Sequence, residues 1–310
     1  DDPADSLEYH QQLRNFPVKI LPTWRPDNLL KAEDPEQFNQ YITKLEKVSG
    51  KNIPDYATLL EVLDERHAFF DQMGCRASDH GLERMYYTDD KGTDPENAFK
   101  KLRRGESLSD PETEGYRFSI MQELCKLNHK RGWVQQFHLG AMRNNNTRMF
   151  RQRGADIGFD SIANPQDGFK ISRFLDSLDQ NHQLTKTILY NLNPADNEMF
   201  VSMIGNFQDG STPGKIQYGA AWWFLDHIQG MEKHLADVST LGLLSRFVGM
   251  VTDSRSFLSF PRHEFFRRIA CNYIGHQVEK GAIPNDQEIL KTMVEGISWR
   301  NAHEYFNLPE

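Results

Sequence analysis

Short apolar runs alternate with longer segments of helical periodicity along the whole chain. Most runs are too short for globular helices, and several are rich in Val, Ile, Phe or Tyr, which favours strands. Six such runs occur: Val18–Trp24, Cys75–His80, Trp133–Gly140, Thr187–Leu192, Lys215–Trp223 and Arg246–Asp253. We predict a strand at each of them.

Three segments between the runs show helical spacing. The segment Tyr56–Phe70 carries Leu59, Leu60, Leu63, His67 and Phe70 at three- and four-residue steps. Asp110-Pro111 is a helix start signal ahead of Thr113–Arg131. The segment Phe260–Lys280 repeats Phe265, Ile269, Tyr273 and Ile274 on one side and is followed by Gly281, a residue typical of helix ends. We predict a helix over each segment.

Alternating strands and helices predict an α/β fold in which helices cover a parallel sheet. Nearly every run ends in polar residues, as in a barrel whose site is assembled at the carboxyl ends of many strands. An open sheet would concentrate them at one switch point, and the sequence has no GxGxxG turn. Without internal repeats or a long linker, residues 1–310 are expected to form one domain of the (β/α)₈ barrel type.

Charge and cysteine usage narrow the class of protein. The formal net charge of −8 argues against a nucleic-acid or membrane partner, since either requires a basic face. The three cysteines, Cys75, Cys125 and Cys271, show no CxxC pattern, so a reducing cytoplasm is the simplest setting. No apolar run approaches the length of a transmembrane helix, and the first residues do not resemble a signal peptide.

The stretch Thr252-Asp253-Ser254-Arg255 places a carboxylate at the end of an apolar run, with an arginine two residues later. Such an aspartate can bind a divalent metal, accept a proton, or do both in turn. It can equally cap the next helix or pair with Arg255. The spacing alone leaves both interpretations open.

A second polar stretch runs from Gln135 through His138 and Arg143 to three successive asparagines, Asn144 to Asn146. A histidine at a strand end can bind a metal or donate a hydrogen bond to a substrate oxygen, although it can also be structural. The asparagines suit a backbone that needs turn chemistry and side-chain hydrogen bonds.

Two further run ends carry candidate side chains. Arg25 stands where Pro26 ends the first run, and its guanidinium is suited to bidentate binding of a carboxylate. Its alternative is a salt bridge to Asp27 or another surface acid. His80 closes the second run and has a structural alternative too. Trp222 belongs to an aromatic stretch that suggests packing, although an indole can line a sugar face. Together these run ends indicate a small anionic substrate and acid–base or metal chemistry.

Eight strings resemble, in this order, those of uronate (glucuronate/galacturonate) isomerases of the amidohydrolase superfamily: LPTWRPD, SDH, GWVQQFHLGAMRNNN, FDS, NFQ, AAWWF, LLSRFVGMVTDSRSFLS and RHEFFRR. The resemblance covers essentially the whole chain. It implies a distorted (β/α)₈ barrel and a bacterial enzyme that interconverts D-glucuronate with D-fructuronate and D-galacturonate with D-tagaturonate.

The resemblance also implies roles for individual residues. Asp253 corresponds to a metal-binding aspartate at the end of the last strand, and His138 to a fifth-strand histidine that is a possible second ligand. Arg25, Arg143 and Arg255 match substrate-contacting arginines. Trp222 resembles an active-site tryptophan, and His80 is expected near the substrate. Asp253, His138 and Arg255 are therefore the expected catalytic residues, with zinc as the expected metal and manganese as an alternative.

One departure from the family pattern affects the expected architecture. The family opens with a strand that ends in His-x-His, and this sequence contains no His-x-His. The six runs are therefore expected to be strands three to eight of the barrel, with the N-terminal segment of the same protein as a missing partner and a homo-oligomer possible. Two alternatives remain: a metal-dependent hydrolase of a sugar ester or lactone, and a truncated, non-catalytic barrel fragment.

Overall fold

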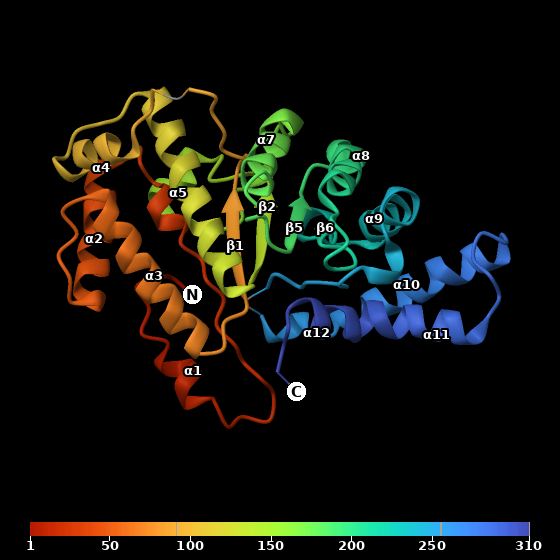
Figure 1. Ribbon diagram of the computed structural model, residues 1–310. Helices are drawn as coiled ribbons and strands as arrows, with labels where there is room; N and C mark the ends of the chain where they lie inside the picture. The colour runs from red at the N-terminus through yellow and green to blue at the C-terminus, as the bar shows by residue number, and fades with distance from the viewer. Residues whose placement is uncertain (91, 255, 310) are drawn as a thin grey trace. The chain divides into compact units, whose positions relative to one another are not determined.

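Four of the six apolar runs form one sheet in the computed structural model, which describes residues 1–90, 92–254 and 256–309 (Figure 1). The strands are β1 (Ala77–Leu82), β2 (Val134–Leu139), β5 (Thr187–Asn191) and β6 (Ile216–Tyr218), in the order β1-β2-β5-β6. In the parallel pair β5–β6, Thr187 is opposite Ile216 and Leu189 is opposite Tyr218. Helices join successive strands, as parallel pairing requires. The predicted α/β class with a parallel sheet is confirmed.

The run Val18–Trp24 is not a strand, contrary to the prediction. Only Trp24 makes a sheet contact, an isolated parallel bridge to Ser78. Pro22 has no N–H group to donate to a neighbouring strand. Val18 is 64% exposed, so it is not buried as an inner strand residue would be. The apolar composition of this run was therefore misleading, because the run does not form a buried strand.

The run Arg246–Asp253 also contains no strand among its described residues. A left-handed Gly249, with φ of 86°, interrupts the extended backbone. A side chain takes the place of a partner strand at the start of the run. The amide of Gln217 donates to the carbonyl oxygen of Arg246 at 2.9 Å, and its oxygen accepts from the N–H of Val248 at 3.2 Å.

Two compact units make up the chain, and the first comprises residues 1–80, 85–136 and 169–185. Its helices begin at polar capping residues: the Asp34 carboxylate accepts from the first turn of one helix, and Ser109 and Glu112 form a capping box on another. Its elements are α1 (Glu8–Gln12), η1 (Asp27–Leu30), α2 (Pro35–Ser49), α3 (Tyr56–Gln72), α4 (Pro95–Arg103), α5 (Asp110–Arg131) and most of α7 (Gly168–Asp179).

The second unit comprises residues 81–84, 137–168 and 186–309, and so holds the carboxyl ends of β1 and β2 together with β5 and β6. A short antiparallel pair, β3 (Ala141–Met142) with β4 (Ser161–Ile162), follows β2. The other elements are α6 (Thr147–Arg153), η2 (Pro194–Asp196), α8 (Asn197–Met203), η3 (Ile204–Phe207), η4 (Trp223–Leu225), α9 (Ile228–Leu241), η5 (Leu244–Arg246), η6 (Phe257–Ser259), α10 (Arg262–Glu279), α11 (Gln287–Glu295), η7 (Gly296–Arg300) and α12 (Asn301–Tyr305). The prediction of one domain stays a prediction.

All three predicted helices are confirmed, as α3, α5 and α10. One detail of α10 is wrong: Phe265 is 39% exposed, and the neighbouring Phe266 is buried instead. Gly281 follows α10 with φ of 74°, as a helix-terminating glycine does. Across the described residues, every helix is too short or too polar to cross a lipid bilayer.

Candidate functional site

Four polar side chains gather around β1 in the first unit. The Nη1 atom of Arg25 donates to Oδ2 of Asp79 at 2.8 Å, and its Nε donates to Oδ2 of Asp27 at 3.3 Å. The other oxygen of Asp27 lies 2.9 Å from Nδ1 of His80, whose side chain is fully buried. Trp24 delivers Arg25 to this position, because its bridge to Ser78 sets the preceding backbone against β1.

This cluster combines a cation with two carboxylates of its own chain. Arg25 therefore forms the salt bridge to Asp27 that was the structural alternative, and a second one to Asp79. Its side chain is 42% exposed, so the guanidinium still reaches solvent. A substrate carboxylate approaching Arg25 would meet repulsion from Asp27 and Asp79 as well as attraction. The cluster can bind an anion only by sharing the guanidinium with these residues.

In the second unit, His138 at the end of β2 is enclosed by aromatic rings. Its imidazole stacks on Tyr190 of β5, with ring centroids 4.1 Å apart and an interplanar angle of 5°. Trp222 meets it edge-on, with centroids 4.5 Å apart and an angle of 73°. His138 is 7% exposed. The two rings restrict its plane, as a catalytic or metal-binding imidazole requires.

Trp222 is itself held by a buried polar network. Its indole Nε1 donates to the carbonyl oxygen of Asn191 at 3.1 Å, and the Asn191 amide donates to Oδ1 of Asn197 at 2.9 Å. The Tyr218 hydroxyl donates to the same Asn197 oxygen at 2.8 Å, and Asn197 donates to Asp237 at 2.9 Å. Since Trp222 is only 2% exposed, its main contribution is to position His138.

Arg143 joins this aromatic row through Trp223. The guanidinium carbon lies 4.7 Å from the centroid of the Trp223 ring, and the indoles of Trp222 and Trp223 are 5.8 Å apart. Trp223 has φ of 49°, a left-handed conformation that is rare for a bulky residue. Arg143 also lies 3.4 Å from Asp160 and 3.6 Å from Asp156. The structure thus brings together His138, Trp222 and Arg143.

The three asparagines after Arg143 shape the loop, as predicted. Asn144 is left-handed, with φ of 56°, and its N–H donates to Asp160 at 2.7 Å. The Asn145 amide donates to the carbonyl oxygen of Met142 at 2.9 Å. Asn146 caps α6 by accepting from the N–H of Met149 at 3.1 Å. These contacts fix the backbone that presents Arg143.

Asp253 lies in an exposed, irregular segment and also adopts a left-handed conformation, with φ of 43°. It does not cap the following helical turn: the Ser256 hydroxyl accepts from the N–H of Leu258 at 3.2 Å and caps η6. That part of the structural alternative is wrong. Arg255 lies outside the described residues, so its pairing and its catalytic role stay predictions.

The described residues do not fit a complete metal site. In residues 1–90, 92–254 and 256–309, no three His, Cys, Asp or Glu side chains gather so that they could hold a metal ion. A stable zinc site normally needs three or four protein ligands. Asp253 and His138 fall short of that number even taken together.

Two buried histidines outside this arrangement have strongly perturbed acidity. His67 of α3 stacks on Trp133 with centroids 3.7 Å apart, and its Nε2 lies 3.1 Å from Oδ1 of Asn128. Burial lowers the pKa of His67 from 6.5 to about 3. Burial likewise lowers the pKa of His234 of α9 to about 4. Both rings are neutral at physiological pH and belong to the core.

Several side chains around Arg25 and His138 were not predicted as site residues. From the sequence, Tyr190 and Asn191 were interpreted only as the end of a buried strand. Two polar side chains at a strand end could have indicated a site there. Asp27 was considered only as an alternative partner of Arg25. Trp223 was indistinguishable from Trp222, and its conformation depends on tertiary structure.

The fold and these residues define an α/β protein with polar and aromatic side chains at the carboxyl ends of parallel strands. A model of the glucuronate isomerase family matches residues 1–306, so the chain belongs to that family. The chain is 51% identical over 310 residues to a uronate isomerase of Bacteroides fragilis, covering 99% of this chain and 66% of the relative.

Solved structures agree with this assignment. A crystal structure of uronate isomerase from Thermotoga maritima matches with a TM-score of 0.89 and 34% identity, covering 99% of this chain and 66% of that one. A glucuronate isomerase from Caulobacter crescentus shares the fold, with a TM-score of 0.89 at 24% identity, covering 100% of this chain and 63% of that one. The chain thus spans 66% of the length of the Bacteroides and Thermotoga relatives.

Proposed function

We propose that this protein takes part in the interconversion of D-glucuronate with D-fructuronate and of D-galacturonate with D-tagaturonate. The observation that carries the proposal is the family match, which extends over residues 1–306. The row His138–Trp222–Trp223–Arg143 supports it, because it provides a fixed imidazole and a cation in one unit.

The reaction moves a hydrogen between C2 and C1 of the open-chain sugar acid through an enediol. Such a reaction needs a base near C2 and donors to the oxygens on which negative charge develops. In our proposal Asp253 accepts the proton of a sugar hydroxyl and returns it to the ring oxygen during ring opening. His138, Arg143 and Arg255 donate to the reacting oxygens, and Trp222 holds the imidazole in place.

The far end of the substrate carries a carboxylate that must be held in register. We assign it to Arg25, which is partly exposed and can present an N–H group beside its bonds to Asp27 and Asp79. His80 supports this arrangement from within the sheet through Asp27. Arg25 contributes binding, whereas Asp253 contributes to the chemical step.

We extend the proposal to the architecture of the complete protein. We infer that the sheet belongs to a (β/α)₈ barrel in which β1, β2, β5 and β6 take the places of strands four to seven. The runs Val18–Trp24 and Arg246–Asp253, which form no strand here, would stand at positions three and eight, and an N-terminal segment of the same protein would complete the barrel. The family resemblance implies zinc or manganese, for which Asp253 and His138 would supply two of the ligands. Homo-oligomer formation is likewise inferred. The free thiols of Cys75, Cys125 and Cys271 support a reducing compartment such as the bacterial cytoplasm.

The experiment that tests the function is an interconversion assay in D₂O, followed by NMR. This chain is assayed alone and with the part of the Bacteroides fragilis relative that the match leaves uncovered, each with zinc or manganese. We expect glucuronate to form fructuronate in the completed protein, with deuterium from solvent at C1 of the ketose. Full retention of the substrate hydrogen over many turnovers would replace the enediol by hydride transfer but keep the isomerase.

Two outcomes would overturn the proposal. Hydrolysis of a sugar ester or lactone, without interconversion of uronates, would favour a metal-dependent hydrolase on the same scaffold. No turnover of any of these substrates by the completed protein would favour a non-catalytic barrel fragment. The relative itself serves as the positive control in the same buffer.

A further inference from the structure

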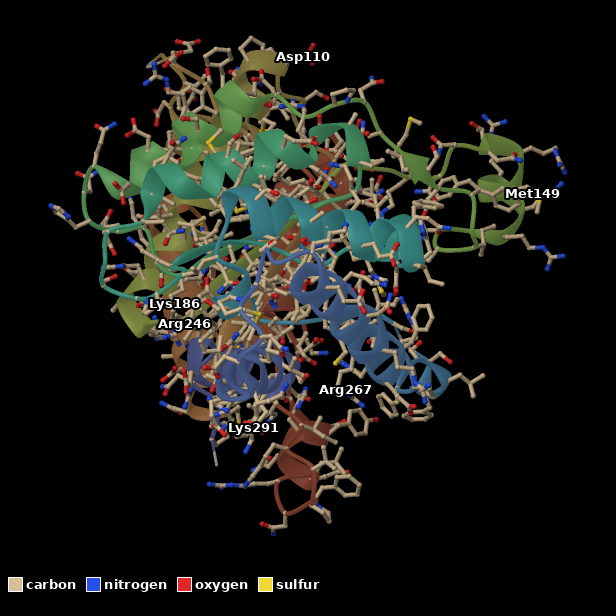
Figure 2. The ribbon with its side chains drawn as sticks, turned by 90° about the vertical axis from the view of Figure 1, so that its right-hand side faces the viewer. Asp110, Met149, Lys186, Arg246, Arg267 and Lys291 are labelled. Carbon is tan, nitrogen blue, oxygen red and sulfur yellow. The ribbon has the colours of Figure 1, made fainter. Side chains whose placement is uncertain are left out.

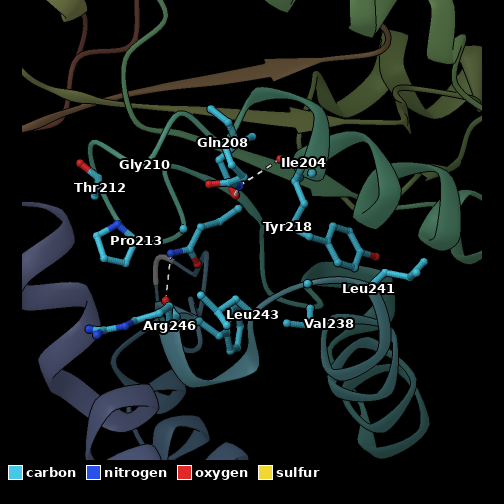
Figure 3. Close-up of a pocket in the computed structure, with 16 residues that line it drawn as sticks. Ile204, Gln208, Gly210, Thr212, Pro213, Tyr218, Val238, Leu241, Leu243 and Arg246 are labelled. Carbon is cyan, nitrogen blue, oxygen red and sulfur yellow. Dashed lines mark hydrogen bonds between the residues drawn. The ribbon is translucent and has the colours of Figure 1, made fainter.

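A cavity of about 370 Å³ lies in the second unit at the amino end of β6 (Figure 3). It is formed by η3 and the loop that follows it, by β6, and by the segment from the end of α9 to Phe247. A cavity of roughly 150 Å³ holds one benzene molecule, so this one has room for a ligand of about ten to fifteen non-hydrogen atoms.

The cavity is distinct from the candidate functional site. None of the residues assigned to the proposed reaction is among its lining residues, although Tyr218, at the carboxyl end of β6, also belongs to the network that holds Trp222. Most of the other lining residues lie before β6 or at its start, or between α9 and Phe247 at the start of the last apolar run. The residues assigned to the proposed reaction follow their strands or runs instead, as Trp222 and Asp253 do. The amino and carboxyl ends of parallel strands lie at opposite edges of the sheet.

One wall of the cavity is apolar and partly open to water. Ile204, Val238 and Phe247 are buried and form its inner part. Leu241 and Leu243 also line it but are 51% and 52% exposed. Covering two leucines and the buried surface behind them would remove apolar area from water, which favours a ligand with an apolar body.

The glutamine amides at the rim of the cavity are occupied by hydrogen bonds within the protein, and one charged side chain lies beside them. Both amide hydrogens of Gln208 go to backbone carbonyls, at 3.0 Å to Ile204 and 2.7 Å to Ile216. The Gln217 amide is bonded at both ends, to Arg246 and Val248. Among the described lining residues, Arg246 alone is charged.

The Arg246 guanidinium forms no ion pair within the described part of the chain. Its side chain is exposed (Figure 2). In Figure 3 it extends outward past Pro213, away from the leucine wall. An anionic group would therefore be held at the rim while the apolar body fills the cavity.

We propose that this cavity is a binding site for small amphipathic carboxylates with an aromatic or branched aliphatic body. The apolar wall supplies most of the affinity, and Arg246 selects anions over neutral and cationic analogues of the same shape. The site goes beyond the proposed isomerase reaction and does not depend on it.

The test is isothermal titration calorimetry of the protein with three probes of matched shape: 3-phenylpropionate, 3-phenylpropan-1-ol and 3-phenylpropylamine. We expect saturable binding of the acid with a Kd on the order of 1 mM. The alcohol should bind roughly threefold to fivefold more weakly, in keeping with a solvent-exposed ion pair, and the amine more weakly still. In Arg246→Met the acid should fall to the level of the alcohol, while the alcohol is unchanged.

Matched variants locate the ligand. The double variant Leu241→Ala/Leu243→Ala should weaken both acid and alcohol by about tenfold, whereas Leu258→Ala, at a leucine that is 87% exposed elsewhere in the same unit, should change neither. Arg151→Met is the control for Arg246→Met. The proposal is overturned if no probe binds below about 20 mM. It is also overturned if the acid and alcohol bind equally, or if Arg25→Met abolishes binding, which would place the ligand at the candidate functional site.

Discussion

The imidazole of His138 lies face to face with the phenol ring of Tyr190, only 5° from parallel. The two residues come from neighbouring strands, β2 and β5, so sheet pairing itself brings the rings together. Trp222 closes the edge of the imidazole. The orientation of the proposed catalytic histidine is therefore set by the sheet and its two aromatic neighbours.

Replacing Tyr190 with leucine should disturb this orientation without emptying the core. We expect kcat for glucuronate to fall about tenfold in the completed protein, because a loosened imidazole spends less time in its productive geometry. Tyr190→Phe keeps the stacked ring and should stay within about threefold of the wild type. Steady-state kinetics gives the rates, and the NMR shift of the His138 ring protons reports the stack. A kcat unaltered by Tyr190→Leu would remove His138 from the chemistry.

Arg25→Met should mainly raise KM for glucuronate. A charge-assisted hydrogen bond to the substrate carboxylate is lost from ground and transition states alike, so we expect a rise of about tenfold or more with kcat little changed. The control is Arg104→Met, which removes another exposed arginine with its own carboxylate partner, Glu106. If Arg25→Met has no effect on KM, the carboxylate is held elsewhere, and Arg143 is the next candidate.

Asp253→Asn tests the proposed proton transfer. Asparagine tolerates the left-handed backbone at this position, so the substitution removes the basic carboxylate and keeps the loop. We expect kcat to fall roughly 10²-fold or more for either uronate, with an unchanged circular dichroism spectrum. Asp253→Ala adds backbone strain and should also lower the melting temperature. Full activity of the asparagine variant would contradict the assignment.

The buried His67 predicts a loss of stability in mild acid. Its pKa is about 3 in the folded protein against 6.5 ordinarily, so below about pH 6.5 only the unfolded chain takes up this proton. The free energy of unfolding should therefore fall as the pH drops from 6.5 towards 3. His67 alone contributes a loss of about 2 kcal/mol between pH 7 and pH 5.

Urea denaturation at several pH values measures this effect. His67→Gln should be less stable at pH 7 but should show a shallower pH dependence, by about one proton between pH 4 and 6. His182→Gln, at an exposed histidine, should leave the slope unchanged. An equal slope in His67→Gln and the wild type would mean that folding does not lower the pKa of His67.

The sequence predicted the sheet where each apolar run is buried on both sides, as with Thr187–Asn191, in which every residue is buried. The strand prediction was wrong at Val18–Trp24, because Pro22 has no N–H to donate and Val18 is exposed. It was wrong at Arg246–Asp253, because Gly249 turns the backbone. Single polar residues at strand ends were identifiable. Their partners were not, because the contacts of Arg25 with Asp79 and of His138 with Tyr190 join segments that are distant in the chain.

The Gln217 amide that holds Arg246 and Val248 does the work of a neighbouring strand. An extended segment beside a short strand usually presents free N–H and C=O groups, to which a strand of another molecule can attach. Here the Arg246 carbonyl and the Val248 N–H are already occupied by one side chain. Gln217→Leu would keep the bulk but leave the buried Val248 N–H without this partner, which would lower the free energy of unfolding by about 1–3 kcal/mol.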